Sequence, residues 1–303
     1  MLFSMKRLNT EQRVRIIRAL VEGCSLRATA RMTGVSLNTV MKFLADFGPV
    51  CQRFHDERVT NLDAVERVQA DEVWSFCGSK QKNVPLGEEK NPNYGSVWTW
   101  TALCADTKLM VNWYVGGRDA ACAGRFMRDL ASRLANRVQL TTDGHHVYER
   151  AVEAAFGWGG VDYAMLVKIY GENRDAEARY SPCECLGTKK MPVMGQPVKE
   201  DVSTSFVERQ NLTLRMSNRR FTRLTNAFSR RIRNLKASLA IHYCYYNWCR
   251  IHQSLRVTPA MEAGIADRVW DIADLVALME AEEAAVIGTE ANKRGPYRKS
   301  KTA

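Results

Sequence analysis

The stretch VQADEVWSF at positions 68–76 decides the fold class. Its apolar residues alternate with others around Asp71, which is the period-two pattern of a β-strand. Similar runs rich in β-branched and aromatic residues predict further strands at 97–104, 109–115, 138–142 and 163–169. The first two of these runs are joined by the turn sequence Ala-Asp-Thr-Lys and predict a hairpin. Amphipathic patterns at 120–134 and 148–156 predict helices between the strands, so we expect a mixed α/β sheet covered by helices.

Ahead of this sheet, residues 9–47 have helical patterning. Three short helices, with Gly34 in a tight turn between the second and third, predict a helix-turn-helix, because such a turn favours a residue that tolerates positive φ. An ordinary three-helix bundle is the alternative interpretation. In a helix-turn-helix, three side chains point outward from the third helix and are candidates for contacts in the major groove: Asn38, Thr39 and Lys42.

The chain therefore divides into four parts. We expect a helix-turn-helix domain at 1–50, a polar linker at 51–66, an α/β domain at 67–256, and an amphipathic helix with a basic tail at 257–303. Within the third part, residues 171–205 are rich in Gly, Pro, Lys and Glu and lack clear periodicity, which predicts a long loop or insertion. After Ser205 we expect one long helix that continues through Arg233.

The formal net charge is +11, from 44 basic and 33 acidic residues, and the isoelectric point is near 9.3. This charge predicts a polyanionic partner, of which nucleic acid is the commonest, although charge alone does not separate DNA from RNA or an anionic membrane. The first residues lack the pattern of a signal peptide, and Asp106, Thr107 and Lys108 interrupt the most apolar stretch. We therefore expect a cytoplasmic protein with no membrane partner.

Three acidic residues stand out by their position. Asp71 lies within the first strand, Asp143 ends a later strand just before Gly144, and Glu208 lies in the first turns of a helix. Glu208 is the only acidic residue between 202 and 261, where it is surrounded by eleven arginines and lysines. Each acid alone has a structural explanation, such as an ion pair or a turn. Together they favour a site where a divalent cation binds the carboxylates and DNA phosphates neutralise the arginines.

Such a set suits phosphodiester chemistry. Mg²⁺ takes oxygen ligands and accepts a few carboxylates together with substrate phosphate oxygens. Two such ions can activate the attacking oxygen on one side of the phosphorus and stabilise the departing oxygen on the other. Three carboxylates suffice, because one bridges the ions and each of the others anchors one ion.

Four motifs carry a resemblance to a known family. They are ADEVWSF around Asp71, TTDGHHVY around Asp143, SFVERQNLTLR around Glu208, and YNWCRIHQSLRVTPA at 246–260. In this order they resemble the DDE transposase and integrase superfamily, in particular bacterial insertion-sequence transposases of the insertion sequence 1 type, over about residues 8–287. The resemblance implies a ribonuclease H-like catalytic domain at 67–256.

The resemblance also implies an activity. The enzyme would bind the terminal inverted repeats of its insertion sequence, cleave each end with two Mg²⁺ ions to expose a 3′-hydroxyl, and join the ends to target DNA, with Mn²⁺ able to replace Mg²⁺. It would act near the bacterial nucleoid on double-stranded DNA, without a small-molecule substrate. Because two ends have to be brought together, a homodimer or higher homo-oligomer is implied.

Several further residues are candidate contacts. Those on or after the Glu208 helix that could bind DNA are Arg209, Asn211, Arg215, Arg219 and Arg223, although Arg215 could equally be a solvated surface charge. His145 and His146 follow Asp143 and are auxiliary candidates that could steady the attacking water, but a histidine in such a loop is more often a plain polar residue. Two rival functions are a non-catalytic sequence-specific DNA-binding regulator and a ribonuclease H-like structure-specific nuclease.

Overall fold

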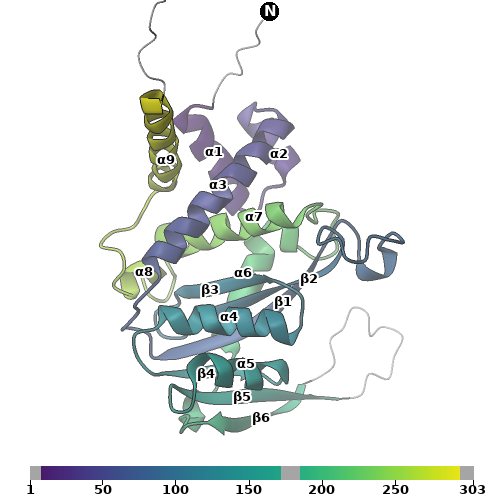
Figure 1. Ribbon diagram of the computed structural model, residues 1–303, viewed down its shortest axis with the longest axis vertical. Helices are drawn as coiled ribbons and strands as arrows, with labels where there is room; N and C mark the ends of the chain where they lie inside the picture. The colour runs from purple at the N-terminus through teal and green to yellow at the C-terminus, as the bar shows by residue number, and fades with distance from the viewer. Residues whose placement is uncertain (1–7, 172–184, 294–303) are drawn as a thin grey trace, which may run out of the picture.

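The computed structural model of the chain describes residues 8–171 and 185–293 (Figure 1). Its centre is a six-stranded sheet with the strand order β3-β2-β1-β4-β5-β6. The strands are β1 (Arg67–Cys77), β2 (Gly95–Cys104), β3 (Met110–Gly116), β4 (Val138–Asp143), β5 (Val161–Tyr170) and β6 (Cys185–Met194). β1, β2 and β3 pair antiparallel, β1, β4 and β5 pair parallel, and β6 pairs antiparallel with β5. The predicted mixed α/β fold class is therefore confirmed.

The sixth strand corrects the prediction of a long loop or insertion at 171–205. Residues 185–194 form an edge strand whose side chains are all exposed or half-buried. Because neither face of β6 is fully buried, its sequence lacks the apolar alternation by which strands are recognised. Lysines on an exposed edge, such as Lys189 and Lys190, are also typical of strands that avoid pairing with other chains. Residues 172–184 lie outside the described part of the chain.

Three helices precede the sheet: α1 (Thr10–Val21), α2 (Leu26–Thr33) and α3 (Leu37–Arg58). The side chains of Asn9, Ser25 and Ser36 cap their N-termini. Gly34 ends α2 with φ of 68°, the left-handed conformation that the predicted turn requires. The order of helices and the turn are thus as expected from the sequence.

The length of α3 corrects the linker expected at 51–66. The helix has 22 residues and includes 51–58, so the connection to β1 begins only at Val59. The stretch 51–58 is polar overall, but Cys51, Phe54 and His55 lie on one buried face at helical spacing. The polar composition of residues 51–58 therefore did not indicate that they form the amphipathic end of a helix that packs on the protein.

The helix α3 packs directly on α7 (Ile232–Cys244), as Figure 1 shows. A Cβ atom added at Gly48 of α3 would lie 2.3 Å from both Cα and Cβ of Ala237 in α7. A glycine opposite a small alanine side chain allows this approach of the two backbones. The N-terminal helices are therefore docked on the rest of the protein, and removal of residues 1–50 would uncover the buried side of α7.

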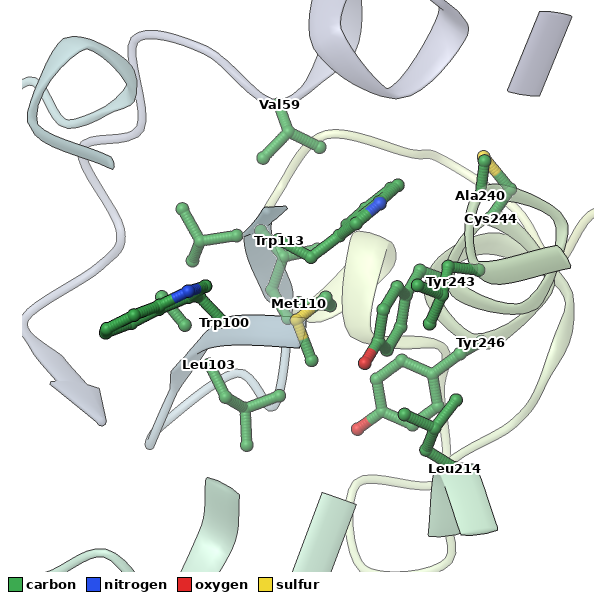
Figure 2. Packing of buried hydrophobic residues seen from close by; sticks show 14 of the residues in the cluster. Val59, Trp100, Leu103, Met110, Trp113, Leu214, Ala240, Tyr243, Cys244 and Tyr246 are labelled. Carbon is green, nitrogen blue, oxygen red and sulfur yellow. The ribbon is translucent and has the colours of Figure 1, made fainter. Parts of the chain in front are cut away.

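Helices cover both faces of the sheet. α4 (Ala120–Arg133) and α5 (Val147–Phe156) lie on one face, and α6 (Ser205–Ser217) and α7 lie on the other (Figure 1). Figure 2 shows the core between the sheet and α7, where Met110 and Trp113 of β3 approach Tyr243. The ring centroids of Trp113 and Tyr243 are 4.8 Å apart. Trp74 lies outside this core, because 40% of it is exposed and its indole N–H donates to Ser96.

The long helix expected after Ser205 is interrupted. α6 ends at Ser217, a 3₁₀ turn follows at Arg219–Phe221, and α7 starts only at Ile232. The buried side chain of Asn218 causes the break, because it accepts from the Arg220 backbone N–H and donates to the carbonyl of Ser238 in α7. No glycine or proline marks this position, so the sequence pattern did not reveal it.

The C-terminal part continues with a π-helical turn at Tyr245–Cys249, α8 (Pro259–Glu262) and α9 (Ile272–Lys293). α9 packs on α1, where the guanidinium of Arg13 lies 3.0 Å from the carboxylate of Glu283. The basic tail at 294–303 lies outside the described residues. In the part of the chain that is described, no helix has the length and apolar character needed to cross a bilayer.

Candidate active site

Two of the three predicted acids come together at one edge of the sheet. β1 and β4 pair in parallel as far as Ala70 opposite Thr142. Asp71 and Asp143 are the next residues on the two strands, so the pairing places them side by side. Carboxylate oxygens of Asp71, Asp143 and Glu72 lie within 4.8 Å of one another. The ends of parallel strands are a common position for functional sites in α/β proteins.

The electrostatics of Asp71 favour a cation. Burial, together with the negative charge of Asp143, raises the pKa of its carboxyl to about 6. The hydrogen bond from the side-chain amide of Asn211 acts in the opposite direction. Carboxylates held close together in this way repel each other, and a hard divalent cation with a preference for oxygen ligands would relieve that repulsion. The residues present therefore fit an oxygen-ligated divalent cation.

α6 is fixed along β1 by two side chains that point to the same face of the strand. The amide oxygen of Gln69 accepts hydrogen bonds from the backbone N–H groups of Phe206 and Val207, at 2.9 and 3.1 Å. One turn further along α6, the Nδ2 atom of Asn211 donates to Oδ2 of Asp71 at 2.8 Å. Glu208 lies between these two attachments, on the side of α6 that faces the acids.

The carboxylate of Glu208 is nevertheless turned toward a lysine. Its Oε1 atom accepts from Nζ of Lys168 at 2.6 Å and from Oγ1 of Thr204 at 2.5 Å. Glu208 is not among the three acids within 4.8 Å of one another, although its negative charge contributes to the raised pKa of Asp71. Burial acts to lower the pKa of Lys168, but the hydrogen bond to Glu208 and the charge of Glu208 raise it, with a smaller contribution from the charge of Asp71. The ammonium of Lys168 is thus the cation that Glu208 holds in this structure.

Glu72 was missed by the sequence analysis. Its side chain is only 1% exposed; Oε2 accepts from the Tyr148 hydroxyl at 2.9 Å and Oε1 from Nε of Arg118 at 2.6 Å. Burial raises the pKa of Glu72 to about 7, with a further contribution from the charge of Asp143. Adjacent residues of a strand point to opposite faces, so the strand pattern does not place Glu72 beside Asp71. Asp143, at the strand end, is close to both.

The two histidines have different surroundings. The half-buried ring of His145 is stacked on Trp100 with 6.3 Å between centroids, and burial together with the charge of Arg118 lowers its pKa. Its backbone N–H donates to Oδ1 of Asp143 at 3.1 Å. The contact of His145 with the acidic site is therefore made by its main chain, while His146 is exposed.

The predicted DNA contacts fall into two groups. Asn211 is buried, and its amide is hydrogen-bonded to Asp71 and Thr101. Its predicted role as a DNA contact is therefore corrected: Asn211 holds the carboxylate of Asp71. Thr39 is half-buried and its hydroxyl is hydrogen-bonded to that of Ser36 in the cap of α3, which leaves it less available to a groove. The remaining candidates have exposed or half-buried side chains: Asn38, Lys42, Arg209, Arg215, Arg219 and Arg223.

No protein-family profile matches the sequence, and no curated protein matches it. The chain is similar to a piggyBac transposase synaptic complex with hairpin DNA, with a TM-score of 0.40 and 11% identity over 100% of this chain and 80% of that one. It is also similar to the Mos1 strand transfer complex, with a TM-score of 0.23 and 13% identity over 80% of this chain and 79% of that one.

A third similar structure is the Mos1 transposase paired-end complex with the left transposon end, with a TM-score of 0.23 and 14% identity. The match covers 54% of this chain and 60% of that chain, which is less than two thirds of its length. TM-scores this low carry no argument about function, so the function rests on the geometry of the site.

Proposed function

We propose that this chain is a DNA transposase of the DDE type, related to the insertion sequence 1 transposases. The observation that carries the proposal is the convergence of Asp71, within β1, and Asp143, at the end of β4, where the parallel pairing of the two strands stops, with α6 fixed beside them. The sheet order, with antiparallel β1–β3 followed by parallel β4 and β5, is what we expect of a ribonuclease H-like core.

The proposed metal ligands are Asp71, Asp143 and Glu208, which would hold two Mg²⁺ ions, with Mn²⁺ able to replace them. When bound, these ions activate the attacking oxygen and stabilise the departing one. Asn211 keeps the carboxylate of Asp71 oriented through its 2.8 Å hydrogen bond. Glu208 can act as a ligand only when its carboxylate releases the ammonium of Lys168 and binds a metal ion instead. The ammonium then becomes free to contact a phosphate.

The proposed reaction has two steps. A water oxygen bonds to the phosphorus at the element end while the bond from phosphorus to the 3′ oxygen breaks, which leaves a 3′-hydroxyl and a 5′-phosphate. That 3′-hydroxyl then attacks a phosphodiester of the target, so that one P–O bond replaces another. In this proposal the sheet edge holds the reacting phosphate, while the arginines of α6 and the segment after it neutralise neighbouring phosphates.

The remaining parts of the proposal concern the partners. α1–α3 would recognise the terminal inverted repeats through Asn38 and Lys42, and synapsis of two ends would require a homodimer or higher homo-oligomer. We expect the enzyme to act on double-stranded DNA in the bacterial cytoplasm. The net charge of +11 supports a polyanionic partner.

An assay with labelled element ends and Mg²⁺ separates the proposal from its rivals. A transposase shifts the DNA in a gel, cuts it at the element end and joins it to an unlabelled target. A DNA-binding regulator only shifts the DNA, and a structure-specific nuclease cuts without joining. Joined product in the presence of Mg²⁺, and its absence with EDTA, is the expected result.

The third metal ligand is tested by comparing Glu208→Gln with Glu72→Gln. We expect Glu208→Gln to weaken Mn²⁺ binding at least about tenfold, because a carboxylate ligand is lost. Glu72→Gln keeps an amide oxygen that can accept from Tyr148, and we expect Mn²⁺ binding to change much less. Isothermal titration calorimetry measures the affinity of both variants for Mn²⁺, with exposed Glu149→Gln on α5 as the matched control. The opposite ranking would assign the site to Asp71, Glu72 and Asp143.

Recognition of the element end is tested with Lys42→Ala and Asn38→Ala. Both side chains are exposed on α3, and each groove contact to a base is worth about 1–3 kcal/mol of discrimination. We expect the preference for the element end over unrelated duplex to fall about tenfold or more for each variant. Competition gel shifts measure this preference, and exposed Lys82→Ala, outside α1–α3, is the control. An unchanged preference in both variants would exclude α3 as the recognition helix.

A further inference from the structure

A cavity of about 580 Å³ lies where the N-terminal helices meet the segment that follows α6. Its walls come from three places in the chain: the turn between α1 and α2 with the start of α2, the start of α3, and residues 219–234. The side chains that matter here are Cys24, Arg27, Met41, Arg219, Arg220 and Arg230. We call this space the junction cavity.

The charge of the junction cavity is of one sign. Arg27, Arg219, Arg220 and Arg230 line it, and no aspartate or glutamate does. Among the residues that the structure describes, none of the four arginines forms an ion pair, in contrast to Arg13, whose guanidinium lies 3.0 Å from Glu283. Four guanidinium groups around one space, without a carboxylate, favour the binding of an anion from outside these residues.

Arg220 gives the clearest indication of that anion. It is part-buried; Nε donates to the hydroxyl of Ser229 at 2.8 Å and Nη1 to the hydroxyl of Ser238 at 3.1 Å. Both acceptors are neutral, although a guanidinium carries five N–H donors in a rigid fork. Burial lowers the pKa of Arg220 to about 10, which reflects the cost of enclosing this charge without a counter-ion. The serines orient the fork and leave its charge uncompensated.

The arginine lining and the size of the cavity indicate the chemical class of the anion. Arginine forks match the oxygens of phosphate groups and can bind them bidentately. The cavity is much larger than one phosphate, and it is lined from two sides that belong to different parts of the fold. A chain of phosphates that passes between α2 and the segment 219–234 would contact both sides at once.

The junction cavity is also connected to the acidic site by positive charge. Arg215 lies one turn beyond Asn211 on α6; burial and the charge of nearby Arg223 lower its pKa, and the charge of nearby Asp71 acts in the opposite direction. Arg223 belongs to the segment that leads on to the cavity. Arginines thus follow the chain from the acids to the cavity, as a path for a polyanion would require.

We propose that the junction cavity binds a phosphodiester segment of the DNA backbone and thereby joins recognition by α1–α3 to positioning at Asp71 and Asp143. This inference rests on the proposed function, because it needs DNA as the partner. The backbone contacts position the duplex and carry no sequence information. Arg220 is in this view a positioning residue at a distance from the reacting atoms.

The first test measures duplex affinity as a function of salt concentration. Each phosphate contact that is lost makes the slope of log K against log salt shallower by about 1. We expect this change for Arg220→Met, which fills the space without the charge, and about twice the change for Arg27→Met combined with Arg230→Met. The last two side chains are exposed, so this second variant does not depend on repacking. Exposed Arg150→Met on α5 removes the same charge and should leave the slope unchanged.

The second test follows alkylation of Cys24 by N-ethylmaleimide, with peptides resolved by mass spectrometry. Duplex DNA should slow the modification of Cys24 several-fold in the wild type and less in Arg220→Met. Exposed Cys185 on β6 is the internal reference. Protection by inorganic phosphate at the same phosphate concentration, without protection by duplex, would assign the cavity to a free anion and overturn the inference.

The outcomes separate this inference from the proposed function. If the wild type binds duplex but the salt slopes of the arginine variants are unchanged and Cys24 is not protected, the inference is wrong and the transposase proposal stands. If the wild type binds no duplex under any salt condition, both fail. Shallower slopes together with protection of Cys24 by duplex alone support the inference.

Discussion

Asp71→Asn is expected to reduce the rate of Mg²⁺-dependent cleavage at least about a thousandfold. The variant loses several kcal/mol of transition-state stabilisation, and each loss of about 1.4 kcal/mol lowers the rate about tenfold. Asparagine has nearly the same shape and keeps an oxygen that can accept from Asn211. The fold and DNA binding should therefore survive, as measured by circular dichroism and gel shift. Exposed Asp63→Asn, ahead of β1, is the control and should cleave normally.

The same variant has a pH-dependent stability that can be derived from the pKa of Asp71. The folded protein raises this pKa to about 6 from an ordinary value of 3.8, so the charged form is disfavoured by folding. The unfavourable contribution of Asp71 to the stability of the fold is absent below about pH 4 and grows as the pH rises from there through about 6. Without metal, Asp71→Asn should melt at a higher temperature than the wild type at pH 8, and the difference should vanish near pH 4.

Divalent metal should reverse that order at pH 8, because it stabilises only the protein that retains the carboxylate. Thermal melts with and without Mn²⁺ measure this effect independently of cleavage. A variant that cleaves at the wild-type rate, or that gains as much stability from Mn²⁺ as the wild type does, would remove Asp71 from the metal site.

Gly48→Ala is expected to destabilise the protein by about 1–3 kcal/mol, the usual cost of overpacking a well-packed contact. In an exposed helix the same substitution stabilises by about 1 kcal/mol, because alanine is the better helix former. At Gly48 the added methyl group would lie 2.3 Å from backbone and side-chain carbons of Ala237, so α3 and α7 have to move apart. Urea denaturation measures the change in the free energy of unfolding.

Gly124→Ala in α4 is the matched control. Its Cβ would meet only the Nη1 atom and the central carbon of Arg128, at 3.3 and 4.0 Å, and that long side chain can move. We therefore expect the two substitutions to change stability in opposite directions. Equal effects would mean that α3 and α7 do not pack closely in solution. Because the junction cavity lies between the same two parts of the fold, Gly48→Ala should also weaken duplex binding.

The sequence was sufficient for the elements whose patterns are local. The strand at 68–76 was recognised from the alternation of its residues and the strand at 97–104 from its β-branched and aromatic residues. Gly34 was identified because its turn needs a left-handed residue. The edge position of Asp143 followed from its place at the end of a strand. These features depend on neighbours within a few residues, so they can be predicted from one chain without coordinates.

The tertiary structure decided what depends on partners far along the chain. β6 is a strand because β5 provides its hydrogen bonds, and α6 ends at Ser217 because Asn218 binds to Ser238 in α7. Lys168 and Glu72 entered the site because β5 and the opposite face of β1 approach the same acids. The sequence pattern around a residue shows on which face of a strand or helix the residue lies. Only the packing of distant segments shows what that face contacts, and this packing determined the surroundings of every acid in the site.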